Sequence, residues 1–203
     1  MPRFNQIKSA IAFTLLLLLS ACTSLPTQEY QPTNVTSVSD ASHWELQGKI
    51  AVKSSTDKFS TNLYWFHHTK GNELRLTTPL GTNVLTLKDD QGIAELNVDG
   101  KNYQDTNPQA LLSSVSGITI PFDDIPLWLT GRVSSNDNVI SYNKDGKILS
   151  FTSPDPQADW QVSFISWQQQ SGVEVPRLLK IERQDVQIRI QSNIWQALTT
   201  KSN

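Results

Sequence analysis

The chain is poor in the side chains that form cross-links and bind metals. Its 203 residues include one cysteine, Cys22, and three histidines. A single cysteine cannot form an intramolecular disulfide, so the folded domain depends on its hydrophobic core. His67 and His68 are neighbours in an alternating run and point to opposite faces of a strand, while His43 lies at a linker end. A shared metal site is therefore not expected.

Motifs of catalysis and of nucleic-acid binding are also missing. There is no Gly-x-Ser-x-Gly turn and no glycine-rich phosphate loop. Asp123 and Asp124 are adjacent carboxylates, but they precede an apolar helical segment, where Asp is favoured as a helix cap. Of the 17 basic side chains, Arg3 and Lys8 lie in the N-terminal leader described next. The rest of the chain therefore has 17 − 2 = 15 basic side chains against 19 acidic ones, and it has no excess of positive charge that would attract a nucleic acid. These absences disfavour an enzyme.

The long hydrophobic run is confined to the start of the chain. An apolar segment from Ile11 to Leu19 follows the basic Arg3 and Lys8. It is roughly half of the ~20 residues that cross a bilayer, so residues 1–21 are predicted to be a signal peptide. The sequence Leu-Ser-Ala-Cys that ends at Cys22 resembles the lipobox of bacterial lipoproteins, which predicts acylation of that cysteine.

Residues 22–42 are rich in Ser, Thr and Pro and predict a flexible tether with a span of about 25 Å. Thr23 stands where an Asp would retain a lipoprotein in the inner membrane of enteric-type bacteria. The predicted location is therefore the outer membrane, with the domain facing the periplasm.

Residues 43–203 predict one domain that is mainly β, with short helices (α+β). Alternating runs, with hairpin signals at Asp99-Gly100 and Asp145-Gly146, predict about ten or eleven antiparallel strands. Segments 107–117 and 124–131 interrupt this pattern and begin with Asn or Asp, continue with Pro and end with Gly, as short helices do. We expect both helices to cover the open side of a curved sheet as a lid. The interior beneath is either filled or held open for a ligand.

Several blocks of the chain resemble the family of outer-membrane lipoprotein receptors LolB. They are the lipobox, "WFHHTKGNELRLTTPLG" from Trp65, "ITIPFDDIPLWLTG" from Ile118, "DWQVSFISW" from Asp159 and "VPRLLKIERQDVQIRIQSNIW" from Val175. The resemblance implies an unclosed antiparallel barrel with a helical lid over a hydrophobic cavity. It also implies that the cavity receives the acyl chains of lipoproteins from the periplasmic carrier LolA and passes them to the inner leaflet of the outer membrane.

The resemblance places Leu80 at the tip of a protruding loop that contacts the membrane. Pro79 and Gly81 flank Leu80 and predict a type I turn with the leucine at its apex. The competing interpretation is that Leu80 folds back on its own hairpin, because single leucines on a surface are common.

Strand parity and the lid faces select the residues predicted to bind acyl chains. In one strand the inner face could instead be formed by Tyr64 and Phe66 in place of Leu63 and Trp65, since a shift of one residue exchanges the two faces. The candidates are Ile50, Val52, Leu63, Trp65, Leu96, Leu112, Trp128 and Phe164.

No cofactor is implied, and a monomer is expected. The alternative function is a lipid-anchored scaffold protein of the envelope with a filled barrel core. An apolar dye would distinguish the two interpretations, because an open cavity binds it and a packed core does not.

Overall fold

The structure, a computed structural model, describes residues 29–201. Residues 31–199 form one compact unit, and the described residues of a second unit are Glu29, Tyr30, Thr200 and Lys201. The elements are β1 (Tyr30–Thr33), the 3-10 helix η2 (Val38–Asp40), β2 (His43–Lys53), β3 (Lys58–His68), β4 (Gly71–Thr77), β5 (Asn83–Asp90), β6 (Ile93–Val98), β7 (Lys101–Asp105), α2 (Pro108–Ser116), α3 (Ile125–Leu129), β8 (Asn138–Tyr142), β9 (Ile148–Ser153), β10 (Trp160–Gln170), β11 (Val173–Arg183) and β12 (Val186–Thr200).

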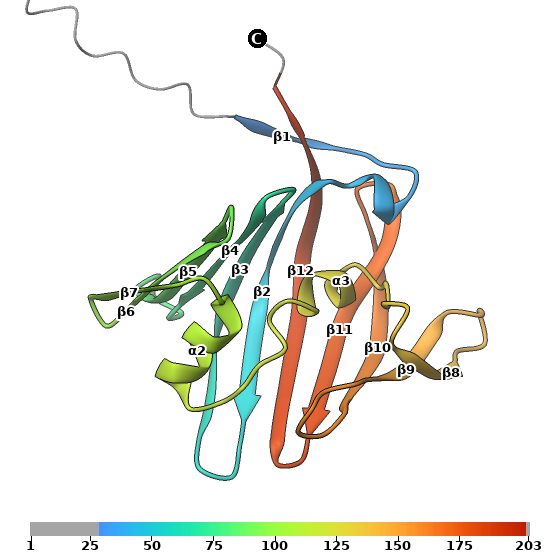
Figure 1. The fold of residues 1–203 in the computed structure, drawn as a ribbon. Coiled ribbons are helices and arrows are strands. Elements are labelled where there is room, and N and C mark those ends of the chain that lie inside the picture. Colours follow the sequence, from blue (N-terminus) through green and yellow to red (C-terminus); the bar gives the residue numbers. More distant parts are fainter. Residues whose placement is uncertain (1–28, 202–203) are drawn as a thin grey trace, which may run out of the picture. The chain divides into compact units, whose positions relative to one another are not determined.

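The strands form one antiparallel sheet that does not close. Their order is β7-β6-β5-β4-β3-β2-β12-β11-β10-β9-β8, with β1 paired to β12 (Figure 1). The order ends at β7 and at β8 within the described part of the chain, which confirms the predicted open antiparallel architecture. The sheet has twelve strands, one or two more than the alternating patterns predicted.

The inner face of the sheet is built from continuous rows of apolar side chains. Residues directly opposite each other on antiparallel strands share a face and contact one another. One such row crosses seven strands from β7 to β12, and it consists of Tyr103, Leu96, Leu87, Leu74, Trp65, Leu46 and Trp195. The period-2 pattern of each strand therefore gives one shared surface rather than separate hydrophobic patches.

The alternating patterns do not indicate two of the strands, β1 and β7, because apolar and polar residues do not alternate in their sequences. All five side chains of β7 are exposed, so its sequence has no buried face to reveal. β1 lies in the segment predicted as a tether, and Val35 nearby donates from its backbone to the carbonyl of Ser171 at 2.9 Å. Ser37 and Asp40 form a capping box on η2. Residues 30–33 and 38–40, within the segment predicted as a tether, thus form a strand and a 3-10 helix.

The two predicted helices lie on the concave side of the curved sheet (Figure 1). α2 contacts β6 and β7, and α3 contacts β11. Asn107 caps α2 by accepting from the backbone of Ala110 at 2.9 Å, and Gly117 ends it with φ 68°. Asp124 precedes α3 without a side-chain capping bond, so that part of the capping prediction is wrong. We call residues 108–131 the lid and residues 117–124 its connector.

Gly131 joins the lid to the sheet through a close approach that only glycine permits. A Cβ at this residue would lie 2.6 Å from the ring of Trp167, and its φ of +76° disfavours other residues. The Trp167 ring is itself packed against Phe164, with ring centroids 5.2 Å apart. Gly146 has the same φ of +76° but open space around it.

Gly131→Ala is expected to destabilise the fold more than Gly146→Ala. The left-handed conformation costs a non-glycine residue about 1–2 kcal/mol in both variants. Only Gly131→Ala adds overlap with the partly buried ring of Trp167, worth about 1–3 kcal/mol more. Urea unfolding of both variants measures the difference, and equal losses would show that Trp167 does not restrain the end of the lid.

Candidate functional site

The structure brings all eight candidate residues into one hydrophobic cluster. None of their side chains is more than 7% exposed. Leu63 and Trp65, and not Tyr64 and Phe66, form the inner face of β3. The first two are buried, whereas the other two are half-buried on the outer face. The hydroxyl of Tyr64 donates to Glu45 at 3.1 Å there. Burial and then Glu45 raise the pKa of Tyr64 to about 12, so the phenol remains a donor at neutral pH.

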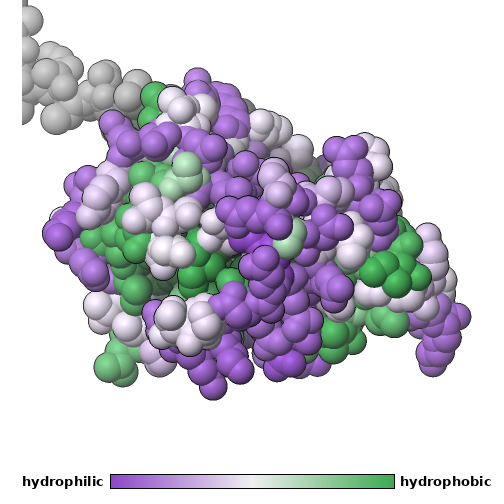
Figure 2. All heavy atoms as spheres, turned by 60° about the horizontal axis from the view of Figure 1, so that its bottom comes forward, coloured by the Kyte–Doolittle hydropathy of each residue, from purple (hydrophilic) through white to green (hydrophobic). Residues whose placement is uncertain are grey.

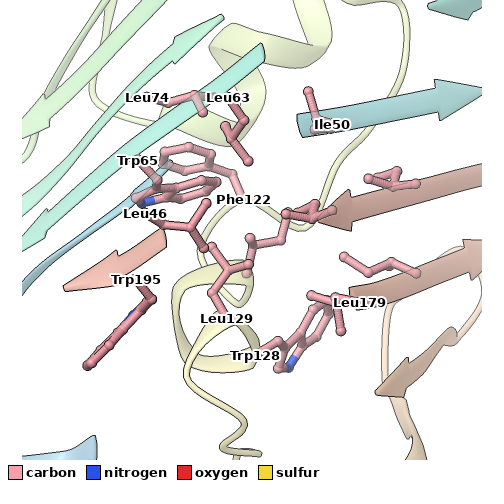
Figure 3. Packing of buried hydrophobic residues seen from close by; sticks show 14 of the residues in the cluster. Leu46, Ile50, Leu63, Trp65, Leu74, Phe122, Trp128, Leu129, Leu179 and Trp195 are labelled. Carbon is pink, nitrogen blue, oxygen red and sulfur yellow. The ribbon is translucent and has the colours of Figure 1, made fainter. Parts of the chain in front are cut away.

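The lid fills the interior with side chains of its own. Phe122 stacks on Trp65 with ring centroids 5.1 Å apart, and Trp128 meets Phe151 edge to face at 5.6 Å. Figure 3 shows Phe122 against Trp65, with Leu129 and Trp128 reaching from α3 toward the sheet.

Three lid residues that the sequence analysis did not select are almost fully buried: Phe122, Ile125 and Leu129. Their spacing of three and four residues is the signal that could have found them.

The interior is closed around the candidate residues and opens at one end. A side chain that borders a water-sized void has solvent-accessible area. The eight candidate side chains have almost none, so no such void lies beside them. Partly buried hydrophobic residues surround the cluster, among them Leu85 and Val98 on the inner face of β5 and β6 and Ile118 and Ile120 in the connector. Figure 2 shows hydrophobic residues in a hollow bordered by hydrophilic ones at the end that lies lowest in Figure 1.

A buried arginine fastens the connector to the sheet. Arg183 on β11 donates to Asp155 at 2.9 Å and to the backbone carbonyl of Thr119 at 3.3 Å. Its guanidinium also lies 4.2 Å from the ring centre of Trp160. Thr119 belongs to the connector, so this one side chain links the lid, the β9–β10 loop and β11.

Carboxylates beside the lid are held in an unfavourable environment. Burial, and then the charges of Asp137, Asp123 and Asp155, raise the pKa of Asp124. Burial raises the pKa of Asp123, and burial followed by Asp123 raises the pKa of Asp89. Asp123 and Asp124 are themselves solvent-exposed at the end of the connector, so solvent screens their charges.

Polar groups in the interior are only partly satisfied. Trp65 donates to the side chain of Asn72 at 3.0 Å, and the same oxygen lies 2.9 Å from Nδ1 of His67. Burial lowers the pKa of His67. In the part of the chain that the structure describes, four other buried indole N–H groups have no hydrogen-bond partner, and they belong to Trp128, Trp160, Trp167 and Trp195. Within residues 29–201 no cluster of three or more His, Cys, Asp or Glu side chains is arranged to hold a metal ion.

Leu80 extends into solvent at the tip of the β4–β5 turn. The backbone of Gly81 donates to the carbonyl of Thr78 at 2.9 Å, which closes a β-turn with Pro79 and Leu80 at its centre. Leu80 is 95% exposed, so the interpretation that it folds back on its hairpin is wrong. Cys22 and the predicted signal peptide lie outside the described residues. Between residues 29 and 201 no helix has the length and apolar content to cross a bilayer.

The fold and the site define a class of protein: an open antiparallel sheet with an apolar concave face, closed by a lid of short helices. Residues 42–195 match the family described as "Outer membrane lipoprotein LolB". Two relatives named "Outer-membrane lipoprotein LolB" are each 60% identical to the chain. That of Shewanella frigidimarina aligns over 189 residues, 93% of each chain, and that of Shewanella denitrificans over 184 residues, 91% of each chain.

The chain therefore belongs to the LolB family of outer-membrane lipoproteins, which act in the localisation of lipoproteins. This confirms the predicted family, function and outer-membrane location. A crystal structure of a DUF1329 family protein from Desulfovibrio piger has a similar fold, with a TM-score of 0.50 and 10% identity over 81% of this chain and 88% of that one.

Arg183→Ala is expected to lower the free energy of unfolding by about 3 kcal/mol, because it leaves the partly buried Asp155 without its partner. Arg183→Met combined with Asp155→Leu should recover most of this loss, since both charges are then removed. Arg75→Ala, which breaks a largely exposed pair with Glu73, is the control and should cost about 0–1 kcal/mol. Urea unfolding measures all three, and a small loss for Arg183→Ala alone would contradict the proposed link.

Asp124→Asn is expected to stabilise the fold at pH 7 and to make no difference below pH about 3, where the carboxyl is protonated in both states. The folded pKa of Asp124 is raised, so its stabilising protonated form is lost as the pH rises through that pKa. Asp185 should have the opposite effect on stability, because its hydrogen bonds with Ser55 lower its pKa and so favour the ionised form in the folded state. Asp185→Asn should therefore destabilise at pH 7, and the same sign for both variants would refute this assignment.

Proposed function

We propose that the chain accepts lipoproteins from the periplasmic carrier LolA and inserts them into the inner leaflet of the outer membrane. In this proposal the acyl chains of the cargo occupy the interior between the sheet and the lid. Cys22 carries the lipid that anchors the protein to the same membrane. The protein acts as a monomer and without a cofactor.

The observation that carries this proposal is the continuous apolar inner face beneath a lid of separate, short elements. The lid element α3 is only five residues long, and its buried side chains Ile125, Trp128 and Leu129 cover the inner face without belonging to the sheet. We assign acyl-chain binding to the inner-face residues Ile50, Val52, Leu63, Trp65, Leu96 and Phe164 and to the lid residues Leu112 and Trp128.

Acyl chains can replace the lid residues at little net cost. An acyl chain with about 14 buried methylenes is stabilised by roughly 11 kcal/mol, at about 0.8 kcal/mol each. Exposing four large lid side chains costs roughly 6–12 kcal/mol, at about 1.5–3 kcal/mol each. These are Phe122, Ile125, Trp128 and Leu129. The two amounts are similar, so the cargo itself supplies the free energy that opens the closed interior.

The polar groups near the lid favour the same exchange. A buried N–H group without an acceptor destabilises the closed state by about 1–3 kcal/mol. Trp128 has such a group, and the ester carbonyls of an acylated cysteine are acceptors.

Leu80 acts at the last step, where the cargo leaves for the bilayer. Its turn lies at the same end of the sheet as the β2–β3 turn, which is lowest in Figure 1, and its exposed side chain is available to lipid. Burial of one leucine contributes only about 1.5–3 kcal/mol, so it is a weak anchor. We assign to Leu80 the local disturbance of lipid packing at the point where the cargo enters.

Leu80→Glu is expected to leave the acceptance of cargo unchanged and to slow its insertion by roughly tenfold or more, as the loss of a leucine contact with lipid implies. The lipidated chain is placed in liposomes, carrier loaded with a labelled lipoprotein is added, and transfer to the chain and to the bilayer are measured separately.

The matched control is Ile93→Glu. Ile93 is an exposed apolar residue on β6, at the opposite end of the β5–β6 hairpin from the Leu80 turn, so the variant makes the same chemical change away from the hollow. Equal insertion by Leu80→Glu and the wild type would remove Leu80 from the proposal. Failure of the wild type to take cargo from the carrier would refute the proposed function as a whole.

A further inference from the structure

The outer face of the sheet has a groove at the same end as the Leu80 turn. It has a volume of about 480 Å³, and its lining includes Lys53, Lys58, Gln187 and Arg189. These residues come from three adjacent strands in two cross-strand rows, Arg189-Ala51-Ser60 and Gln187-Lys53-Lys58. The small side chains of Ala51 and Ser60 leave the space, and the long cationic ones border it.

The cations of this groove are only partly balanced by carboxylates: the bond with Lys180 and, less strongly, the charge of Arg189 lower the pKa of Glu182, and Asp57 precedes Lys58. Glu182, opposite Gln187 on β11, accepts from Lys180 at 2.8 Å and from Gln187 at 2.7 Å. Asp185 in the nearby turn accepts from the backbone of Ser55 at 2.9 Å. Across residues 29–201, Lys53, Lys58 and Arg189 form no ion pair. Three unpaired cations thus meet in a chain whose formal net charge is -2.

The groove is structurally joined to the Leu80 turn. Thr61 donates to the carbonyl of Thr77 at 2.5 Å, and Asn62 donates to the carbonyl of Thr78 at 3.1 Å. Thr61 directly follows Ser60 on β3, so the base of the turn is fixed beside the groove. Phe59, between Lys58 and Ser60, lies opposite Val52 and so faces the inner side of the sheet, which leaves Leu80 as the exposed apolar residue nearest to the groove's outer face.

We propose that this basic groove, bordered by Lys53, Lys58 and Arg189, binds the phosphates of anionic phospholipid headgroups and so orients the chain on the membrane. Basic residues beside exposed apolar ones are the combination that binds the interface of anionic bilayers. Arg189 can hold a phosphate through two N–H groups, and the two lysines add point charges. The groove then holds the headgroup layer while Leu80 reaches the acyl region.

The exposed Leu80 in the adjacent turn favours lipid over an acidic protein surface as the occupant of the groove. An exposed leucine at a turn tip gains nothing from a purely electrostatic protein contact, whereas a bilayer offers both a charged layer and an apolar one. The inference rests on the proposed contact of Leu80 with the membrane, but it is tested without cargo and without the carrier.

The test compares Lys53→Gln/Lys58→Gln/Arg189→Gln with the wild type. Both are made in the mature chain with Cys22→Ser, which keeps every described residue but has no lipid of its own. Binding to vesicles of equimolar phosphatidylglycerol and phosphatidylcholine is measured by cosedimentation. Each basic residue at an anionic surface strengthens binding about fivefold, so the triple variant should bind on the order of 100-fold more weakly. Binding to vesicles of phosphatidylcholine alone should not change.

The matched control is Lys70→Gln/Lys144→Gln/Arg177→Gln, which removes the same charge from exposed residues outside the groove. At 0.1 M salt, where the Debye length is about 10 Å, it should bind almost as the wild type does. If both triple variants bound anionic vesicles equally weakly, the proposed role of the groove would be refuted, and the net charge of the chain alone would explain the binding.

Further outcomes separate the groove from the Leu80 proposal. Leu80→Glu should weaken binding to both kinds of vesicle, since its contact does not depend on headgroup charge. If only Leu80→Glu weakens binding, the membrane role of Leu80 stands and the groove proposal fails. If the triple variant binds anionic vesicles normally but loses the transfer of cargo from the carrier, the groove serves an acidic protein surface and the proposal is overturned.

Discussion

The contact between the lid and the inner face of the sheet is the interaction on which the rest of the structure depends. An open sheet with one apolar face is unstable in water unless another layer covers that face. Here the cover is supplied by Phe122 on Trp65 and by α3, and not by a second sheet. Because the sheet does not close, the lid is also the part that can leave without breaking a strand pair. Stability and access to the interior are therefore controlled by the same contacts.

The closed state is a balance of opposing terms around this contact. Apolar burial and the Arg183 bonds to Asp155 and Thr119 hold the connector in place. The buried indole N–H of Trp128, which has no acceptor among the described residues, acts against it. A receptor that takes an acyl chain from one partner and releases it to a bilayer needs an interior whose closed state is only moderately favoured. No nucleotide is required if each host binds the chains more strongly than the last.

Much of the fold could be predicted from the sequence because the strands that build the inner face alternate strictly. The inward direction of Leu63 and Trp65 follows from that pattern and from their neighbours on β2 and β4. The alternating pattern does not indicate β7, since a short edge strand with polar side chains has no buried face; the hairpin signal at Asp99-Gly100 is the one indication of it. The family resemblance, and not composition, led to the choice of a lipid-binding interior over a filled core.

The parts of the site that depend on distant pairs were not predictable. Arg183 and Thr119 are 64 residues apart, and nothing in either segment indicates that they meet. The basic groove likewise joins β2 and β3 to β12, near the end of the chain. The exposure of Leu80 was open to two interpretations until the turn geometry was known.

The central claim is that cargo acyl chains take the place of the protein's own side chains beneath the lid. The most direct test puts a photoreactive benzoylphenylalanine at Leu112 in one variant and at Val115 in another. These residues lie on the same helix, 5% and 38% exposed. After transfer of a lipoprotein with radiolabelled acyl chains from the carrier, irradiation should attach the label at Leu112 and not at Val115. Labelling at Val115 alone, or at neither residue after cargo has been accepted, would contradict the account.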